Sequence, residues 1–151
     1  MNGLQHQVIY AVLMLVAGIG IPTFAALNAE LGVKLQSIAL AATIALSVGT
    51  AASLCFLFLS GGVSRLGPVS PVSFYYYLGG LLIVFYILTM TWVAPKFGVG
   101  SAVAFVLLGQ IIAMATIDHF GLLGALHHPI TIQRFAGLFL MTIGVFLAVR
   151  R

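Results

Sequence analysis

Charge is almost absent from long stretches of this chain, and this limits its fold more than any other feature. Only 5% of the 151 residues are charged and 62% are hydrophobic, with a mean hydropathy of +1.23. A soluble domain needs far more polar residues to cover its surface. The apolar stretches are each long enough to cross a hydrocarbon layer of about 30 Å. The sequence therefore predicts an integral membrane protein.

Five apolar blocks predict an all-α bundle of five transmembrane helices, in a single domain that covers residues 1–151. The predicted spans are 8–27, 37–59, 74–94, 99–117 and 132–149. Between them, "NAELGVKLQS" and "SGGVSRLGPVSP" are polar or rich in Gly and Pro, so they are predicted connections. Pro22 is expected to kink the first helix and Pro95 to end the third.

The few cations give a weak signal for topology. Five crossings put the two termini on opposite sides of the membrane. Arg65 and Arg134 then lie on one side, and the other side holds Lys34, Lys96, Arg150 and Arg151. Cytoplasmic loops are enriched in Lys and Arg, so this small excess favours a cytoplasmic carboxyl terminus. Antiparallel and mixed insertion stay open.

Small residues recur at every fourth position of the second span, where they form one helix face. The members of this stripe are Ser37, Ala41, Ala45, Gly49 and Ser53. Such a face lets another helix approach closely, either in the same chain or in a second copy. Gly144 and Ala148 offer a shorter version on the fifth span. Cys55 is expected to be a small packed hydrophobe.

The chain lacks the residue sets that most enzymes and metal sites need. Its two carboxylates, Glu30 and Asp118, are predicted to lie on opposite sides of the membrane, which argues against a catalytic pair. Asp118 stands near His119, His127 and His128, but their spacing matches no metal site. The cations are dispersed, so a nucleic-acid surface is not expected. We predict no enzyme activity, cofactor, metal or nucleic-acid partner.

Polar and aromatic residues inside the spans are the better candidates for a binding site. Gln110 and Met114 lie one turn apart on the fourth span, and Tyr86, Thr89 and Trp92 lie on the third. These residues are expected to line a cavity that binds an organic molecule, together with backbone groups freed near Pro22. The alternatives are that Trp92 is an interfacial anchor and that Gln110 hydrogen-bonds between helices.

Asp118 needs a local partner, because a negative charge is disfavoured at the carboxyl end of a helix. Backbone N–H groups of the following turn could supply it, and so could Arg134 at the start of the next span. We expect a structural role in this turn, with a gate or coupling role as the alternative. Asn28 is expected to be a structural or gating amide near the first loop.

Three segments resemble one known family over nearly the whole chain. They are "PTFAALNAELG", "LGGLLIVFYILTMTWVAPKFG" and "LLGQIIAMATIDHFGL", and they are similar to the YdcZ-type family of small bacterial inner-membrane proteins in the drug/metabolite transporter superfamily. The resemblance implies a multi-pass exporter of small solutes in the inner membrane. Larger members of that superfamily consist of two inverted five-helix halves, so this chain is expected to match one half.

A half-sized transporter is expected to pair, because alternating access needs two repeats around one site. The resemblance therefore implies a homodimer, and the weak charge bias leaves an antiparallel arrangement open. The small multidrug-resistance branch carries a glutamate in its first span, whereas "VIYAVLMLVAGIGIPTFAAL" has no ionisable side chain. A neutral or anionic substrate is therefore expected. The alternatives are an accessory or assembly subunit and a passive channel.

Overall fold

The structure is a computed structural model that describes residues 3–62 and 72–149. All regular elements among these residues are helices, which confirms the all-α prediction. The chain divides into two units, Met1–Lys96 and Phe97–Arg151, and each is described by itself. Arg65, Arg150 and Arg151 of the predicted charge pattern lie outside the described residues, as does the side chain of Ala148.

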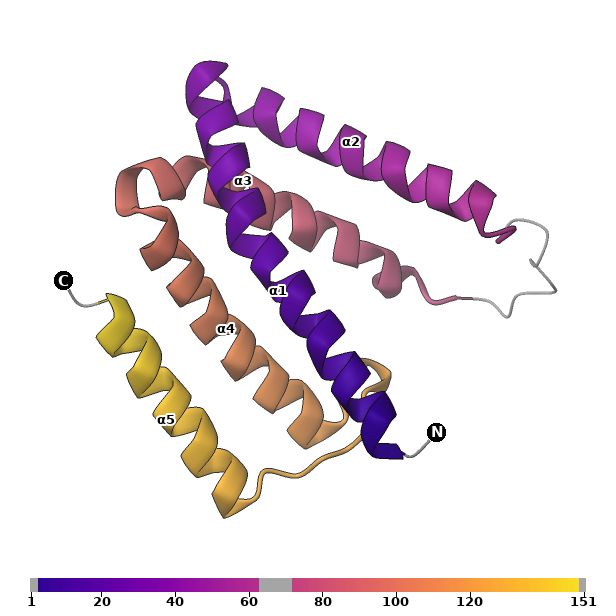
Figure 1. Ribbon diagram of the computed structural model, residues 1–151, viewed down its shortest axis with the longest axis vertical. Coiled ribbons are helices and arrows are strands. Elements are labelled where there is room, and N and C mark those ends of the chain that lie inside the picture. Colours follow the sequence, from indigo (N-terminus) through magenta and orange to yellow (C-terminus); the bar gives the residue numbers. More distant parts are fainter. Residues whose placement is uncertain (1–2, 63–71, 150–151) are drawn as a thin grey trace. The chain divides into compact units, whose positions relative to one another are not determined.

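The described residues of the first unit form three long helices and one short one (Figure 1). The helices are α1 (Gly3–Lys34), α2 (Ile38–Leu59), the 3-10 helix η2 (Phe74–Leu78) and α3 (Gly79–Phe97). Ser37 caps α2, since its side chain accepts a hydrogen bond from the Leu40 backbone N–H. A short turn between α1 and α2 therefore sets these two helices against each other.

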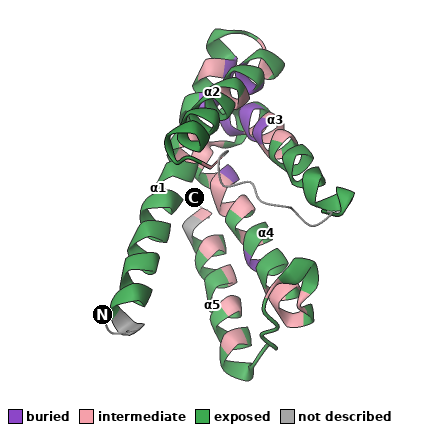
Figure 2. Ribbon diagram, turned by 90° about the vertical axis from the view of Figure 1, so that its right-hand side faces the viewer, coloured by how far each residue is buried: buried purple, intermediate pink, exposed green. Residues whose placement is uncertain are grey.

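The three long helices of this unit meet near one end of each. The carboxyl-terminal part of α1, the start of α2 and the second half of α3 supply the buried residues (Figure 2), which include Ala25, Asn28, Ala41, Ile87 and Thr91. By contrast, residues 5–21 of α1 and 47–59 of α2 are exposed throughout. The packed core of the unit is thus confined to one junction, and the apolar remainder of each helix is left uncovered.

Close approach at this junction depends on small residues. A Cβ added to Gly32 of α1 would lie 2.5 Å from Thr91 Cγ2 of α3 and 3.8 Å from Ala41 Cβ of α2. Only glycine fits at this position without a shift of its neighbours. Ala41 of the small-residue stripe is fully buried, whereas Gly49 and Ser53 are exposed. Within the unit, only the first part of the stripe is packed.

Two helices of the first unit extend beyond their predicted carboxyl ends. The first helix continues past Leu27 to Lys34, through most of the predicted connection, because Asn28 and Ala29 pack against the other helices of the unit. Glu30 therefore lies in α1, where it pairs with Lys34 at 3.5 Å. The prediction that Pro95 ends the third helix is also wrong, since α3 reaches Phe97. A proline this close to a helix end removes only one hydrogen bond.

Pro22 and Cys55 of the first unit also differ from their predicted roles. The helix runs through Pro22 without a break, so the backbone groups expected to be freed there belong to a continuous helix. Thr23 Oγ1 donates a hydrogen bond of 2.9 Å to the Ile19 carbonyl oxygen, close to the site of the missing proline N–H. Cys55 is exposed on α2, which contradicts its predicted packing. The cause is that the second half of α2 has no neighbour among the described residues of its unit.

The second unit is a pair of antiparallel helices. Its elements are α4 (Val99–Phe120), the 3-10 helix η3 (Leu122–Gly124) and α5 (Ile132–Val149), and α4 and α5 lie side by side in both views (Figures 1 and 2). The bounds of α5 agree with the predicted fifth span. The fourth helix is longer than predicted, so that Asp118 falls inside its last turn.

Four segments are long and apolar enough to cross a membrane. They are Gln5–Lys34, Ile38–Leu59, Phe74–Phe97 and Val99–Phe120. The apolar part of the fifth helix, Ile132–Leu147, is shorter. The described helices thus have the character of a multi-pass membrane protein, with α5 the shortest of the predicted spans. The relation to one half of an inverted repeat stays a prediction.

Candidate functional site

A polar cluster forms where α4 ends. Gly121 has the left-handed conformation, with φ of 59°, and its backbone N–H donates to the Ile117 carbonyl oxygen. This is a common helix stop, and glycine adopts it without strain. The chain therefore turns sharply after Phe120 and leaves Asp118 and His119 in the last turn of α4, facing the segment that leads to α5.

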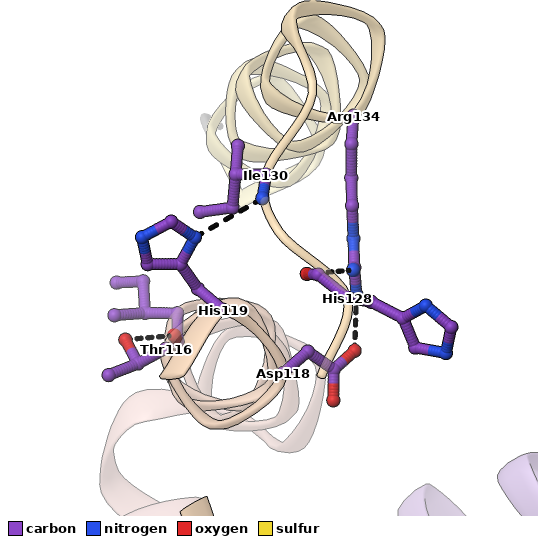
Figure 3. A network of polar contacts seen from close by, with 7 residues as sticks. Thr116, Asp118, His119, His128, Ile130 and Arg134 are labelled. Carbon is purple, nitrogen blue, oxygen red and sulfur yellow. Dashed lines mark hydrogen bonds and ion pairs between the residues drawn. The ribbon is translucent and has the colours of Figure 1, made fainter. Parts of the chain in front are cut away.

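Arg134 of α5 is the partner that the structure gives Asp118 (Figure 3). Its Nη2 donates to Asp118 Oδ2, and its Nη1 donates to the His128 carbonyl oxygen at 3.2 Å. The side chains of Arg134 and Asp118 are 28% and 26% exposed. No backbone N–H of the described residues donates to the carboxylate. Of the two predicted compensations, the ion pair is therefore the one found.

His119 also contacts the segment between α4 and α5, on the side opposite to Arg134. Its Nδ1 accepts a hydrogen bond of 3.2 Å from the Ile130 backbone N–H (Figure 3). In addition, the His128 backbone N–H donates to the Asp118 carbonyl oxygen at 2.9 Å. Three backbone groups of the segment between α4 and α5, at His128 and Ile130, thus form hydrogen bonds to α4 or α5. Among the described residues, no group of three His, Cys, Asp or Glu side chains is placed to hold a metal ion.

A groove runs between α4 and α5. One hollow of about 310 Å³ is lined by apolar side chains of both helices, among them Ile111, Phe135 and Phe139, with His119 at the end where α4 stops. A second hollow of about 170 Å³ is lined by Phe105 and Leu108 of α4 and by residues of α5. Thr142 lines both hollows, so they adjoin along the two helices.

Asn28 has a buried partner in the first unit that the sequence did not reveal. Its Nδ2 donates to Thr91 Oγ1 of α3, and Thr91 Oγ1 donates to the Ile87 carbonyl oxygen at 2.7 Å. Asn28 is 5% exposed and Thr91 is 2% exposed. Asn28 therefore lies inside α1 rather than near a loop, and it joins α1 to α3. The only signal for Thr91 is its helical spacing from Ile87 and Ala94, which places it on the buried face of α3.

Trp92 lies beside a hollow at the junction of α1, α2 and α3. The Lys96 Nζ stands 4.3 Å from the centre of the Trp92 ring, a distance typical of a cation–π contact. Both side chains line a hollow of about 320 Å³ together with Gln36, Ser37 and Thr91. This hollow combines an aromatic face, an amide and an ammonium group.

The other predicted lining residues differ in exposure. Tyr86 and Thr89 of α3 are half-buried, as is Pro22 of α1. The Tyr86 hydroxyl oxygen is itself buried and has no hydrogen-bond partner among the described residues. Gln110 and Met114 of α4 are exposed. Because α3 and α4 belong to different units, a shared cavity between them stays a prediction.

The comparison with protein families identifies the chain. Residues 9–147 match the family described as "Putative inner membrane exporter, YdcZ". The chain belongs to the YdcZ family. It is accordingly a multi-pass protein of the bacterial inner membrane, in a family of transporter type. No curated protein and no solved structure gives a significant match.

Proposed function

We propose that this YdcZ-family chain exports a small neutral or anionic organic solute, and that it works as a homodimer by alternating access. The match to an inner-membrane exporter family over residues 9–147 carries the proposal. The four helices with the length and hydropathy of membrane spans support it.

The charges of the first unit support a substrate that is neutral or negatively charged. Residues 5–29 of α1 contain no Asp, Glu, Lys or Arg, so this part of the helix offers no carboxylate for exchange of a cation against protons. Glu30 is exposed and pairs with Lys34. The hollow beside Trp92 instead presents Lys96 and the Gln36 amide. An ammonium group attracts anions and accommodates neutral hydrogen-bonding molecules, but it repels cations.

Tyr86 supports a binding site on α3. A buried hydroxyl without a partner is rare and costs free energy, which a ligand can recover by forming the missing hydrogen bond. In this proposal, Tyr86 and Thr89 of α3 and α1 near Pro22 contact the substrate in the first unit. Gln110 and Met114 of α4 are also proposed to contact the substrate. Trp92 and Lys96 line the hollow at the junction of α1, α2 and α3, where the ammonium group attracts an anionic group of the substrate.

The exposed halves of the helices support pairing. The apolar side chains at residues 8–21 of α1 are exposed, as is most of the first half of α3. Within the first unit, little space is therefore enclosed around the proposed lining residues of α3. A second copy would supply the other half of an enclosed site, as alternating access between two repeats requires. The rest of the apolar surface would face lipid.

The test is transport by the purified protein in liposomes, against a panel of anionic, neutral and cationic solutes. Once a substrate is found, Tyr86→Phe removes only the hydroxyl and should raise KM by about tenfold, the cost of one buried hydrogen bond. Trp92→Ala and Gln110→Ala should also lower flux. Tyr10→Phe is the matched control, because Tyr10 is exposed on α1. Unchanged flux in all three folded variants would remove this site.

The same preparation separates the proposal from its alternatives. An accessory subunit would be inactive alone and would require a larger partner for transport. A passive channel would conduct down a gradient without saturation, whereas alternating access saturates with substrate. Export of cations only would contradict the charge argument built on Lys96.

A further inference from the structure

The groove between α4 and α5 has the shape of a site for one hydrocarbon chain. From Ile111 to His119 the helix rises by about 12 Å, which is close to the hydrocarbon depth of one leaflet, about 15 Å. The hollow over this stretch has a volume of about 310 Å³. A helix with its side chains is about 10 Å wide, too wide for a hollow of this size.

The lining of this hollow is uncharged and almost without free polar groups. Both threonines in it have used their hydroxyl protons: Thr116 Oγ1 donates to the Ile112 carbonyl oxygen and Thr142 Oγ1 to the Leu138 carbonyl oxygen, each at 2.9 Å. Phe120, Phe135 and Phe139 are exposed along it, so the hollow opens outward. The occupant therefore needs an apolar body that can enter sideways.

His119 supplies a single hydrogen-bond donor at one end of this hollow. Its Nδ1 accepts from the Ile130 backbone N–H, which assigns the ring proton to Nε2. In Figure 3 the second ring nitrogen of His119 points away from the segment between α4 and α5, where Ile130 donates to Nδ1. No residue of the described chain accepts from Nε2. Because α4 ends one residue later, at Phe120, this donor lies near the membrane surface.

We propose that the α4–α5 groove binds the acyl chain of a membrane phospholipid, whose ester carbonyl oxygen accepts a hydrogen bond from His119 Nε2. The apolar hollow binds the acyl chain. The ester group then lies at the edge of the hydrocarbon layer, beside the Nε2–H donor of His119. This inference goes beyond the exporter function and does not depend on transport. It concerns the second unit alone.

Lipids with and without an ester carbonyl test the hydrogen bond. The purified protein is exchanged into equal mixtures of diacyl phosphatidylethanolamine and its ether-linked analogue with the same chain lengths, and retained lipids are counted by native mass spectrometry. The parent should retain the ester lipid over the ether lipid by about fivefold, the effect of one hydrogen bond. His119→Phe keeps a ring of similar size and should abolish the preference. Equal retention of both lipids by the parent would overturn the proposal.

A second pair of variants tests the groove without touching His119. Ala115 lines the hollow, so Ala115→Phe should fill it and remove the retained lipid. Ala113 is exposed on the same helix outside the hollow, and Ala113→Phe should retain lipid as the parent does. Thermal unfolding of each variant in detergent checks that it is folded. Ester-lipid retention that survives in folded Ala115→Phe would place the lipid elsewhere and contradict the proposal.

Discussion

Asp118 is held by a charge and not by the turn that follows it. The carboxylate stands in the last turn of α4, where the helix dipole disfavours it, and Arg134 reaches it from the first turn of α5. The same guanidinium binds the His128 carbonyl oxygen. One arginine thus joins α4, the connection and α5, which favours a structural role for the pair.

Asp118→Asn should therefore destabilise the protein by about 1.5 to 3 kcal/mol, the typical contribution of a hydrogen bond to a charged group. Thermal unfolding of the purified protein measures this. Glu30→Gln is the matched control: its pair with Lys34 is 63% to 71% exposed, and such surface pairs contribute little. If Asp118→Asn is as stable as the parent but shifts the pH dependence of transport, Asp118 is a gate or coupling residue.

The buried Asn28–Thr91 contact should behave as a coupled pair. Thr91→Val keeps the shape of the side chain but leaves the Asn28 amide without its acceptor, at a cost of about 1 to 3 kcal/mol. Asn28→Leu in the Thr91→Val background should cost less than Asn28→Leu alone, because both polar groups are then gone. Additive losses of stability in this double-mutant cycle would contradict a direct interaction between the two side chains.

At the scale of the helices, Gly32 decides how closely α1 approaches α3. Gly32→Ala places a methyl group 2.5 Å from Thr91 Cγ2, so the Thr91 side chain or the helices must shift, with a loss of about 1 to 3 kcal/mol. Gly49→Ala is the control within the same unit, since nothing lies within 4 Å of its added Cβ. Denaturation of both variants should show a loss only for Gly32→Ala. Equal stability would show that the junction is not closely packed.

Hydropathy located the helices because each span is a block of the sequence, read without knowledge of its neighbours. The bounds of α2 and α5 follow from such blocks. The end of α1 could not be predicted in this way, since Asn28 is typical of a loop until its partner Thr91 is known. Asn28 is hydrogen-bonded to Thr91 of α3, and Glu30 pairs with Lys34 within α1. The contact between α1 and α3 is one that no local pattern reveals.

The candidate sites likewise differ in whether a local sequence pattern could predict them. Arg134 could be named as a partner of Asp118 because so few charges are present. Two other features could not be predicted: the contact of His119 with Ile130 and the groove between α4 and α5. Both depend on how the two helices and the segment between them pack. The chemistry of its side chain makes Tyr86 a candidate from the sequence, but only the folded chain shows that its hydroxyl has no partner among the described residues.

For the whole molecule, the proposed homodimer can be tested by the orientation of its two copies. The weak charge bias counted from the sequence allows chains to insert in both orientations. With five crossings, tags at the two termini lie on opposite sides of the membrane. In an antiparallel dimer, each tag should be labelled from both sides of the membrane, in two populations of similar size. One uniform orientation would contradict this arrangement, and two tags always on one side would contradict five crossings.

Forced orientation extends this test to function. Lysines added at the amino terminus draw that end to the cytoplasm, and lysines added at the carboxyl terminus draw the other end there. Each variant alone should insert in one orientation and lose transport, since an antiparallel dimer needs both. Coexpression of the two should restore flux, and equal amounts of two carboxyl-terminal variants carrying different tags are the matched control. Full transport by either variant alone would mean that the functional dimer is parallel, because uniformly oriented chains can pair in no other way.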